Sequence, residues 1–112
     1  KELRLRKNKD FQLVFRKGSS VANRQLVLYV YKNEETKHFR AGISVSKKIG
    51  RAVVRNKLKR RLKEIVRLHA QHIPQGVDLV LIVRPQAVQL TYQELAKSFV
   101  HLLKKAKLYQ KR

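Results

Sequence analysis

The strongest chemical signal in the sequence is a run of cations at residues 51–67. Eight residues of this run are Arg or Lys, and Glu64 is its one acid. A helix would place Arg55, Lys59 and Lys63 next to one another on one face, where like charges repel. An ordinary solvated face mixes in acids to avoid this repulsion. The pattern therefore favours a surface that binds phosphates, which Arg grips with a planar pair of N–H donors.

Aromatic residues form a second candidate site. Phe11 and Phe15 are one helical turn apart, and Tyr29 and Tyr31 share one face of a predicted strand. If these rings line a groove, they can stack on the bases of single-stranded RNA. The alternative is an ordinary core, which is the more frequent fate of phenylalanines at this spacing.

Metal and nuclease chemistry have little support. His69 and His72 have a spacing that can hold a metal, but no third ligand is evident nearby. Glu34 and Glu35 can attract hydrated Mg²⁺, although a solvated loop is the commoner explanation. The seven acids are scattered along the chain, whereas a metal-dependent nuclease needs converging carboxylates. We therefore expect no catalytic residue and no metal ligand in this chain.

Composition points to a polyanionic partner. The chain has 112 residues, 43% of them hydrophobic, which suits one domain with an ordinary core. Its net charge of +21 favours nucleic acid, because binding a polyanion relieves self-repulsion and releases counterions. An anionic membrane is the rival partner, but the cations are not confined to one amphipathic helix. The chain has no cysteine and no long apolar run, so we expect a cytoplasmic protein without a membrane segment.

Periodicity predicts the order αβββαβα within one domain, residues 1–112. Helices are predicted at residues 9–17, at 52–71 and from the Thr91–Glu94 capping box to residue 106. Strands are predicted at 19–22, 25–31, 39–45 and 77–83, with a hairpin loop at 32–37. Asn8 is expected to cap the first helix and Gly18 to follow it. Residues 1–7 are predicted as an extended basic arm and 107–112 as a frayed basic tail.

Several of these segments resemble the bacterial ribonuclease P protein family. Residues 44–63 read SVSKKIGRAVVRNKLKRRLK, and residues 55–60 resemble the RNR signature of that family. Lys57 stands where the name of the signature expects Arg, so the charge is kept but not the planar fork. The resemblance extends to Asn8, Lys9, Asp10, Phe11, Val14, Phe15, Gly18, Arg24, Tyr29, Asp78, Arg84, Leu90, Thr91 and Tyr92.

The resemblance implies a fold and a function. The fold is α+β, a single-layer mixed sheet packed with helices, with a left-handed βαβ crossover where statistics favour a right-handed one. The function is that of the ribonuclease P protein subunit, part of an endoribonuclease whose RNA subunit is the catalyst. The holoenzyme removes the 5′ leader of precursor tRNA and requires Mg²⁺. Partners are the RNA subunit and precursor tRNA, with no DNA and no membrane.

The resemblance also assigns two sets of binding residues. Residues expected to bind the RNA subunit are Lys47, Lys48, Arg51, Arg55, Asn56, Lys57, Lys59, Arg60, Lys63 and Arg67. Residues expected to bind the leader are Phe11, Phe15, Lys17, Val27, Tyr29 and Ser44. A ribosomal protein or RNA chaperone is the alternative function, and it has no need for an aromatic groove.

Overall fold

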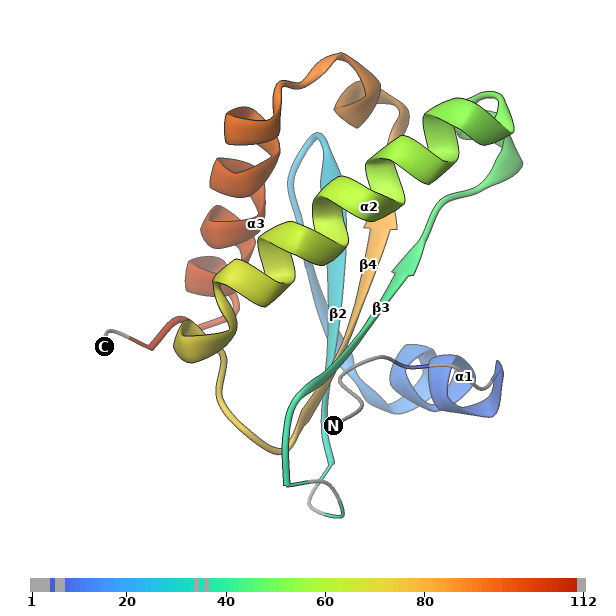
Figure 1. The fold of residues 1–112 in the computed structure, drawn as a ribbon. Coiled ribbons are helices and arrows are strands. Elements are labelled where there is room, and N and C mark those ends of the chain that lie inside the picture. The colour runs from blue at the N-terminus through green and yellow to red at the C-terminus, as the bar shows by residue number, and fades with distance from the viewer. Residues whose placement is uncertain (1–4, 6–7, 34, 36, 111–112) are drawn as a thin grey trace.

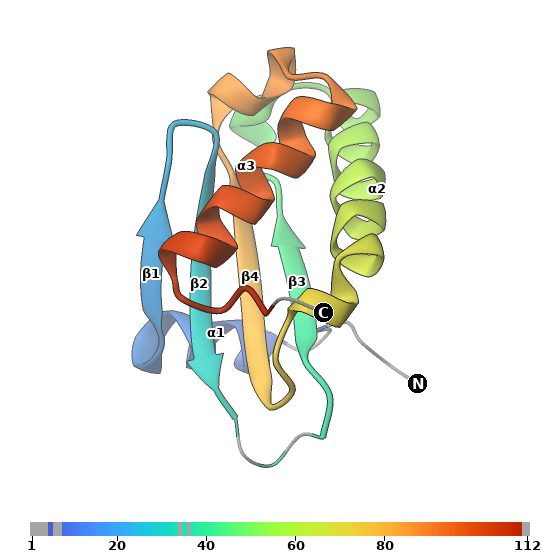
Figure 2. The ribbon, with the colours of Figure 1, turned by 90° about the vertical axis from the view of Figure 1, so that its left-hand side faces the viewer.

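The structure is a computed structural model that describes residues 5, 8–33, 35 and 37–110. Four strands form one sheet, with α2 and α3 on one face and α1 on the other (Figures 1 and 2). The longer helices are α1 (Asn8–Lys17), α2 (Ala52–Leu68) and α3 (Tyr92–Lys105). The strands are β1 (Ser19–Ala22), β2 (Leu26–Lys32), β3 (Arg40–Ser44) and β4 (Val77–Val83). Three short 3₁₀ helices are η1 (Lys47–Ile49), η2 (Ala70–His72) and η3 (Pro85–Gln89). The predicted α+β class and element order are confirmed.

The sheet order is β1-β2-β4-β3, with β4 antiparallel to β2 and parallel to β3. The predicted hairpin at residues 32–37 is therefore wrong, because β2 and β3 are separated by β4. The burial of β4 explains this order. Every residue of β4 except the half-buried Ile82 is buried, so this strand needs neighbours on both sides.

The crossover from β3 through α2 to β4 is left-handed. In Figure 2 both strands run upward, β4 lies to the left of β3, and α2 packs with α3 on the face turned to the viewer. A right-handed crossover would place β4 on the other side of β3, as nearly all such connections do. The handedness implied by the resemblance is thus confirmed.

The core has two parts, one on each face of the sheet. The α2 and α3 side joins Leu28 and Leu81 of the sheet to Leu62 of α2 and Phe99 of α3. The apolar stripe of α2, which recurs at helical spacing, faces this side: Leu58, Leu62 and Ile65 are buried, whereas Val54 and His69 are half-buried. On the other face, α1 packs Val14 against Val80 of β4, and neither side chain is exposed.

Local signals at the helix ends are mostly confirmed. Thr91 and Glu94 form the predicted capping box at the start of α3. Gly18 follows α1, and a Cβ there would lie 2.4 Å from the Val30 carbonyl oxygen, so the tight turn requires glycine. Asn8 is already helical rather than the cap of α1. The prediction of a helix to residue 71 is wrong in its last turn, because α2 ends at Leu68 and the chain tightens into η2.

The two chain ends differ from expectation where the structure describes them. Leu5 is buried, and its N–H donates to the Ala41 carbonyl at the outer edge of β3. The rest of the predicted arm lies outside the described residues. Residues 107–110 do not fray: Tyr109 stacks on His72, and the Gln110 N–H donates to the His72 carbonyl. The predicted frayed tail is therefore wrong up to residue 110.

Candidate RNA-binding surfaces

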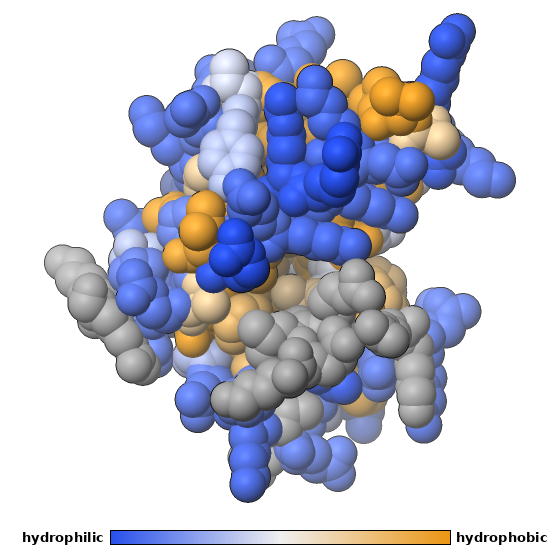
Figure 3. All heavy atoms as spheres, in the orientation of Figure 1, coloured by the Kyte–Doolittle hydropathy of each residue, from blue (hydrophilic) through white to orange (hydrophobic). Residues whose placement is uncertain are grey.

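The first surface is the outer side of α2 with the turn that leads into it. Because the apolar side chains of α2 face α3 and the sheet, its cations are turned outward, and Figure 3 shows hydrophilic side chains gathered over this helix. We call this surface the basic α2 face. Its predicted members that are exposed are Lys47, Lys48, Arg51, Asn56, Lys57, Arg60, Lys63 and Arg67, and Arg55 and Lys59 are half-buried. Each predicted residue is therefore at least partly exposed on α2 or on the turn before it.

The turn before α2 is built by local hydrogen bonds. The Ser46 hydroxyl accepts from the Lys48 N–H and caps η1. Gly50 has a φ of 155°, a conformation that side chains disfavour, and its carbonyl accepts from Arg55 Nε at 3.2 Å. Arg55 therefore also supports the turn, which makes it a less specific probe of RNA binding than the exposed Lys63.

A small hollow on this side adds three residues that are not in the predicted RNA-binding set. The hollow, about 280 Å³, is lined by Lys57, Arg60, Arg61, Glu64 and Tyr92. The Tyr92 hydroxyl donates to Glu64 Oε1 at 3.1 Å. Partial burial raises the pKa of that hydroxyl, and the hydrogen bond to Glu64 raises it further. Arg61 belongs to the cation run of the sequence. Tyr92 comes from α3, and the sequence around it does not indicate a place beside that run.

The second surface lies between α1 and the sheet. Phe15 and Tyr29 are half-buried and meet edge to face, with ring centroids 5.0 Å apart. Phe11 lies against Gly42 of β3, where a Cβ would come within 2.5 Å of the ring. The small residue thus lets the ring approach the strand. These rings pack on Val14 yet keep part of their surface in solvent, so both interpretations of the aromatic pair hold in part.

Strand register extends this surface across the sheet. Ile82 of β4 pairs with Val27 of β2 on one side and with Ser44 of β3 on the other. All three side chains are half-buried. We call Phe11, Phe15, Val27, Tyr29, Ile82 and Ser44 the aromatic strip. The predicted Val27 and Ser44 are thus brought into one row, and Ile82, which the sequence analysis missed, joins them. Lys17 is exposed at the end of α1.

No metal site is evident among the residues that the structure describes. They contain no group of three or more His, Asp or Glu placed to hold an ion. His69 Nδ1 and His72 Nδ1 each lie within hydrogen-bond distance of a backbone carbonyl, of Ile65 and Gln110 respectively. Glu35 is exposed, and Glu34 lies outside the described residues. No helix in the described ranges is long and apolar enough to cross a membrane.

Comparison with known proteins decides between the RNA-binding classes. The ribonuclease P family model matches residues 1–107. The chain belongs to the ribonuclease P protein family. The family resemblance of the sequence is thereby confirmed. The known role of this family is 5′ maturation of tRNA, as the protein subunit of an endoribonuclease holoenzyme.

Individual members of the ribonuclease P family are similar over nearly the full chain. The ribonuclease P protein component of Exiguobacterium sibiricum is 48% identical over 99% of this chain and 96% of its own length. A Staphylococcus aureus RNase P protein mutant with defective mRNA degradation activity has a TM-score of 0.90 and is 48% identical, over 96% of this chain and 90% of its own. The Thermotoga maritima RNase P protein has a TM-score of 0.84 and is 37% identical, over 91% of this chain and 96% of its own.

Proposed function

We propose that the basic α2 face binds the catalytic RNA of ribonuclease P and that the aromatic strip binds the single-stranded 5′ leader of precursor tRNA. The observation that carries this proposal is the separation of two chemistries. Cations gather on α2, whereas partly exposed rings lie on the opposite face of the sheet. A folded, phosphate-rich RNA suits the first surface, and unstacked bases suit the second. A ribosomal protein or RNA chaperone would have no need for the second.

The protein acts by position and charge in this proposal. Its cations lower the repulsion between two RNAs and so favour binding of the substrate and of the Mg²⁺ ions that the holoenzyme requires. The RNA holds those ions, because the described residues of the chain offer no group of converging ligands. The partners are RNA rather than DNA, and the site of action is the bacterial cytoplasm, where precursor tRNA is made.

Reconstitution tests the division of labour. We expect the RNA-free protein to leave precursor tRNA intact in Mg²⁺, and we expect 5′ maturation to appear when the RNA subunit is added. The reason is that the described acids do not converge on a site. Cleavage products are resolved on a denaturing gel, with nuclease-treated protein as the control for residual RNA. The same assay is repeated with an mRNA in place of precursor tRNA, and we expect the RNA-free protein to leave it intact as well. Cleavage of either substrate by the RNA-free protein would contradict the proposal.

Replacement of Phe15 tests leader binding. Phe15→Ala should lower the preference of the holoenzyme for precursor over mature tRNA by about 1–3 kcal/mol, the contribution of one stacked base, which is roughly five- to 150-fold. Mature tRNA has no leader, so its affinity should stay nearly unchanged. The measurement is a pair of dissociation constants.

Phe15→Leu is the matched control, because it keeps an apolar side chain against Tyr29 but offers no ring to a base. We expect it to lose the preference while its thermal unfolding stays close to that of the parent protein. Equal weakening toward both tRNAs, with a large loss of stability, would identify Phe15 as core alone.

A further inference from the structure

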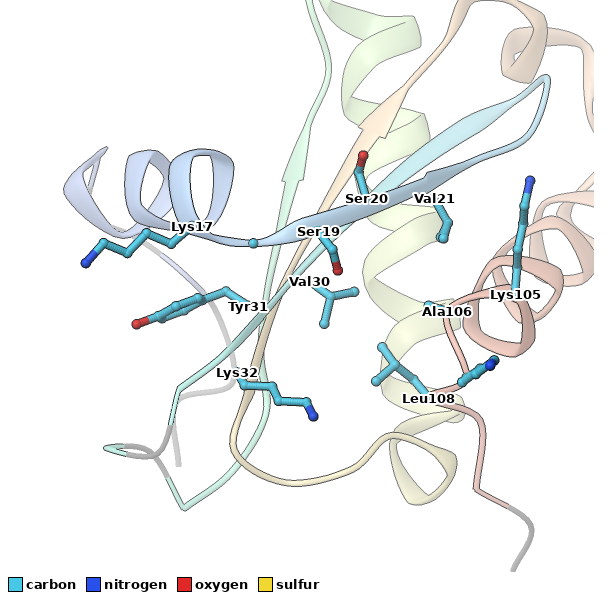
Figure 4. Close-up of a pocket in the computed structure, with 12 residues that line it drawn as sticks. Lys17, Ser19, Ser20, Val21, Val30, Tyr31, Lys32, Lys105, Ala106 and Leu108 are labelled. Atoms are coloured by element: carbon cyan, nitrogen blue, oxygen red, sulfur yellow. The ribbon is translucent and has the colours of Figure 1, made fainter.

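A lysine-rich hollow lies at the end of the sheet where β1 begins and β2 ends. Its volume is about 580 Å³, and α1 borders it on one side and the end of α3 on the other (Figure 4). Lys17, Lys32, Lys105 and Lys107 line it, and none of its lining residues is an acid. We call these four lysines and the space between them the lysine hollow. Its charge makes it complementary to an anion, and its size suits more than one phosphate group.

The hollow has packed walls. Its floor contains Val21, Val30 and Leu108, which pack against the main core. The Lys105 ammonium donates to the Ala22 carbonyl at 2.9 Å and so ties the end of α3 to β1. The Leu108 N–H donates to Leu103, which holds the following segment against the helix. The packed floor and the Leu108–Leu103 backbone bond give the hollow a defined shape, and the Lys105 side chain adds one further tie between its walls.

The hollow and the aromatic strip approach each other at the β1 edge of the sheet, although the apolar floor of the hollow lies on the α3 side. Ser20 of β1 lines the hollow. It pairs across the strands with Tyr29 of β2, so it lies next to a ring of the aromatic strip. Lys17 lines the hollow from α1, the helix that carries Phe15. An RNA strand that crosses the sheet along the row of Gly42, Val80 and Tyr29 therefore reaches β1 at Ser20, on the rim of the hollow. The outer edge of β1 has no strand partner among the described residues.

We infer that the lysine hollow binds the phosphate backbone of leader nucleotides upstream of those that lie on the aromatic strip. This inference rests on the proposed function, because it extends the path of the leader beyond the strip. The lysine ammonium groups meet phosphates, and the hydroxyls of Ser19 and Ser20 can bond phosphate oxygens or the ribose 2′-hydroxyl. Tyr31 is the one ring that lines the hollow, so binding depends on leader length rather than on leader sequence.

A series of leader lengths tests this inference with the reconstituted holoenzyme. Precursor tRNAs with leaders lengthened two nucleotides at a time are bound by the parent protein and by Lys32→Gln/Lys105→Gln. For the parent, affinity should rise in two stages, first as the leader fills the strip and then as it enters the hollow. The double variant should keep the first stage and lose the second, which we expect to be roughly three- to tenfold.

The matched control is Lys37→Gln/Lys97→Gln, which removes the same charge from exposed lysines outside the hollow, the basic α2 face and the aromatic strip. It should keep both stages. The inference is overturned if the parent shows no second stage, if both double variants lose it equally, or if Lys32→Gln/Lys105→Gln weakens mature tRNA as much as long-leader substrate. Absence of the first stage in the parent would instead contradict leader binding by the strip.

Discussion

Binding of the protein to the ribonuclease P RNA should weaken about 10³- to 10⁵-fold when monovalent salt rises from about 50 to 200 mM. This loss is expected for a protein that neutralises roughly six to ten phosphates, because each neutralised phosphate releases counterions from the RNA. The basic α2 face offers that number of at least partly exposed cations on α2 and the turn before it. The measurement is filter binding across a salt series, analysed as the slope of log affinity against log salt concentration.

Two double variants locate the charge effect. Lys59→Gln/Lys63→Gln should reduce the salt slope by about 2, one for each phosphate that the protein no longer neutralises. The fold should survive, because Lys63 is exposed and Lys59 lies off the buried stripe of Leu58, Leu62 and Ile65. Lys37→Gln/Lys97→Gln removes equal charge elsewhere and should leave the slope unchanged. A shallow slope for the parent protein, or the same reduction in both variants, would count against the basic α2 face as the binding surface.

The sequence predicted best what depends on near neighbours in the chain. The capping box at Thr91 and Glu94 needs residues three apart, and it was predicted and is present. The basic α2 face follows from the period of one helix, since burying Leu58, Leu62 and Ile65 turns the cations outward. The strand at residues 77–83 was recognised from its apolar run alone.

Features that join distant segments were missed or needed the family resemblance. The order of β2, β4 and β3 depends on pairing between segments that are far apart in the chain. A local sequence pattern does not reveal which strands pair, so the expected hairpin is wrong. The aromatic strip forms because Ile82 meets Val27 and Ser44 through that same pairing. The docking of residues 107–110 depends on the stacking of Tyr109 on His72, which composition does not reveal.

A buried ion pair is the clearest case of a long-range feature. Asp78 interrupts the apolar run of β4, and its side chain is 1% exposed. Arg40 of β3 donates to both of its carboxylate oxygens, at 3.0 and 2.8 Å, and Asn33 donates to it at 3.0 Å. The hydrogen bonds from Arg40 to Asp78 raise the pKa of the Arg40 guanidinium, although partial burial opposes the rise. The pairing of Arg40 with Asp78 joins residues 38 positions apart in the chain, so no local pattern in the sequence predicts it.

Asp78→Ala should destabilise the protein by about 3–5 kcal/mol, because it removes the buried carboxylate that holds Arg40 and leaves this partly buried cation with only the more distant Asp10. For a domain of this size, the loss should lower the melting temperature by on the order of 15 °C. Asp10→Ala is the matched control: its carboxylate lies 3.7 Å from Arg40, but it is more exposed. That change should cost about 1 kcal/mol or less. Thermal and urea unfolding measure both variants.

A third variant separates the effect of losing the carboxylate from the effect of leaving the Arg40 cation without its main partner. In Arg40→Met/Asp78→Leu both charges are replaced by apolar groups, so much of the stability lost in Asp78→Ala should return. Because Arg40 also contacts Asp10 of α1, the pair helps to hold the helix that carries Phe11 and Phe15 against the sheet. An Asp78→Ala protein that unfolds within about 1 kcal/mol of the parent would show that water reaches Arg40 readily and that the pair does not fix α1.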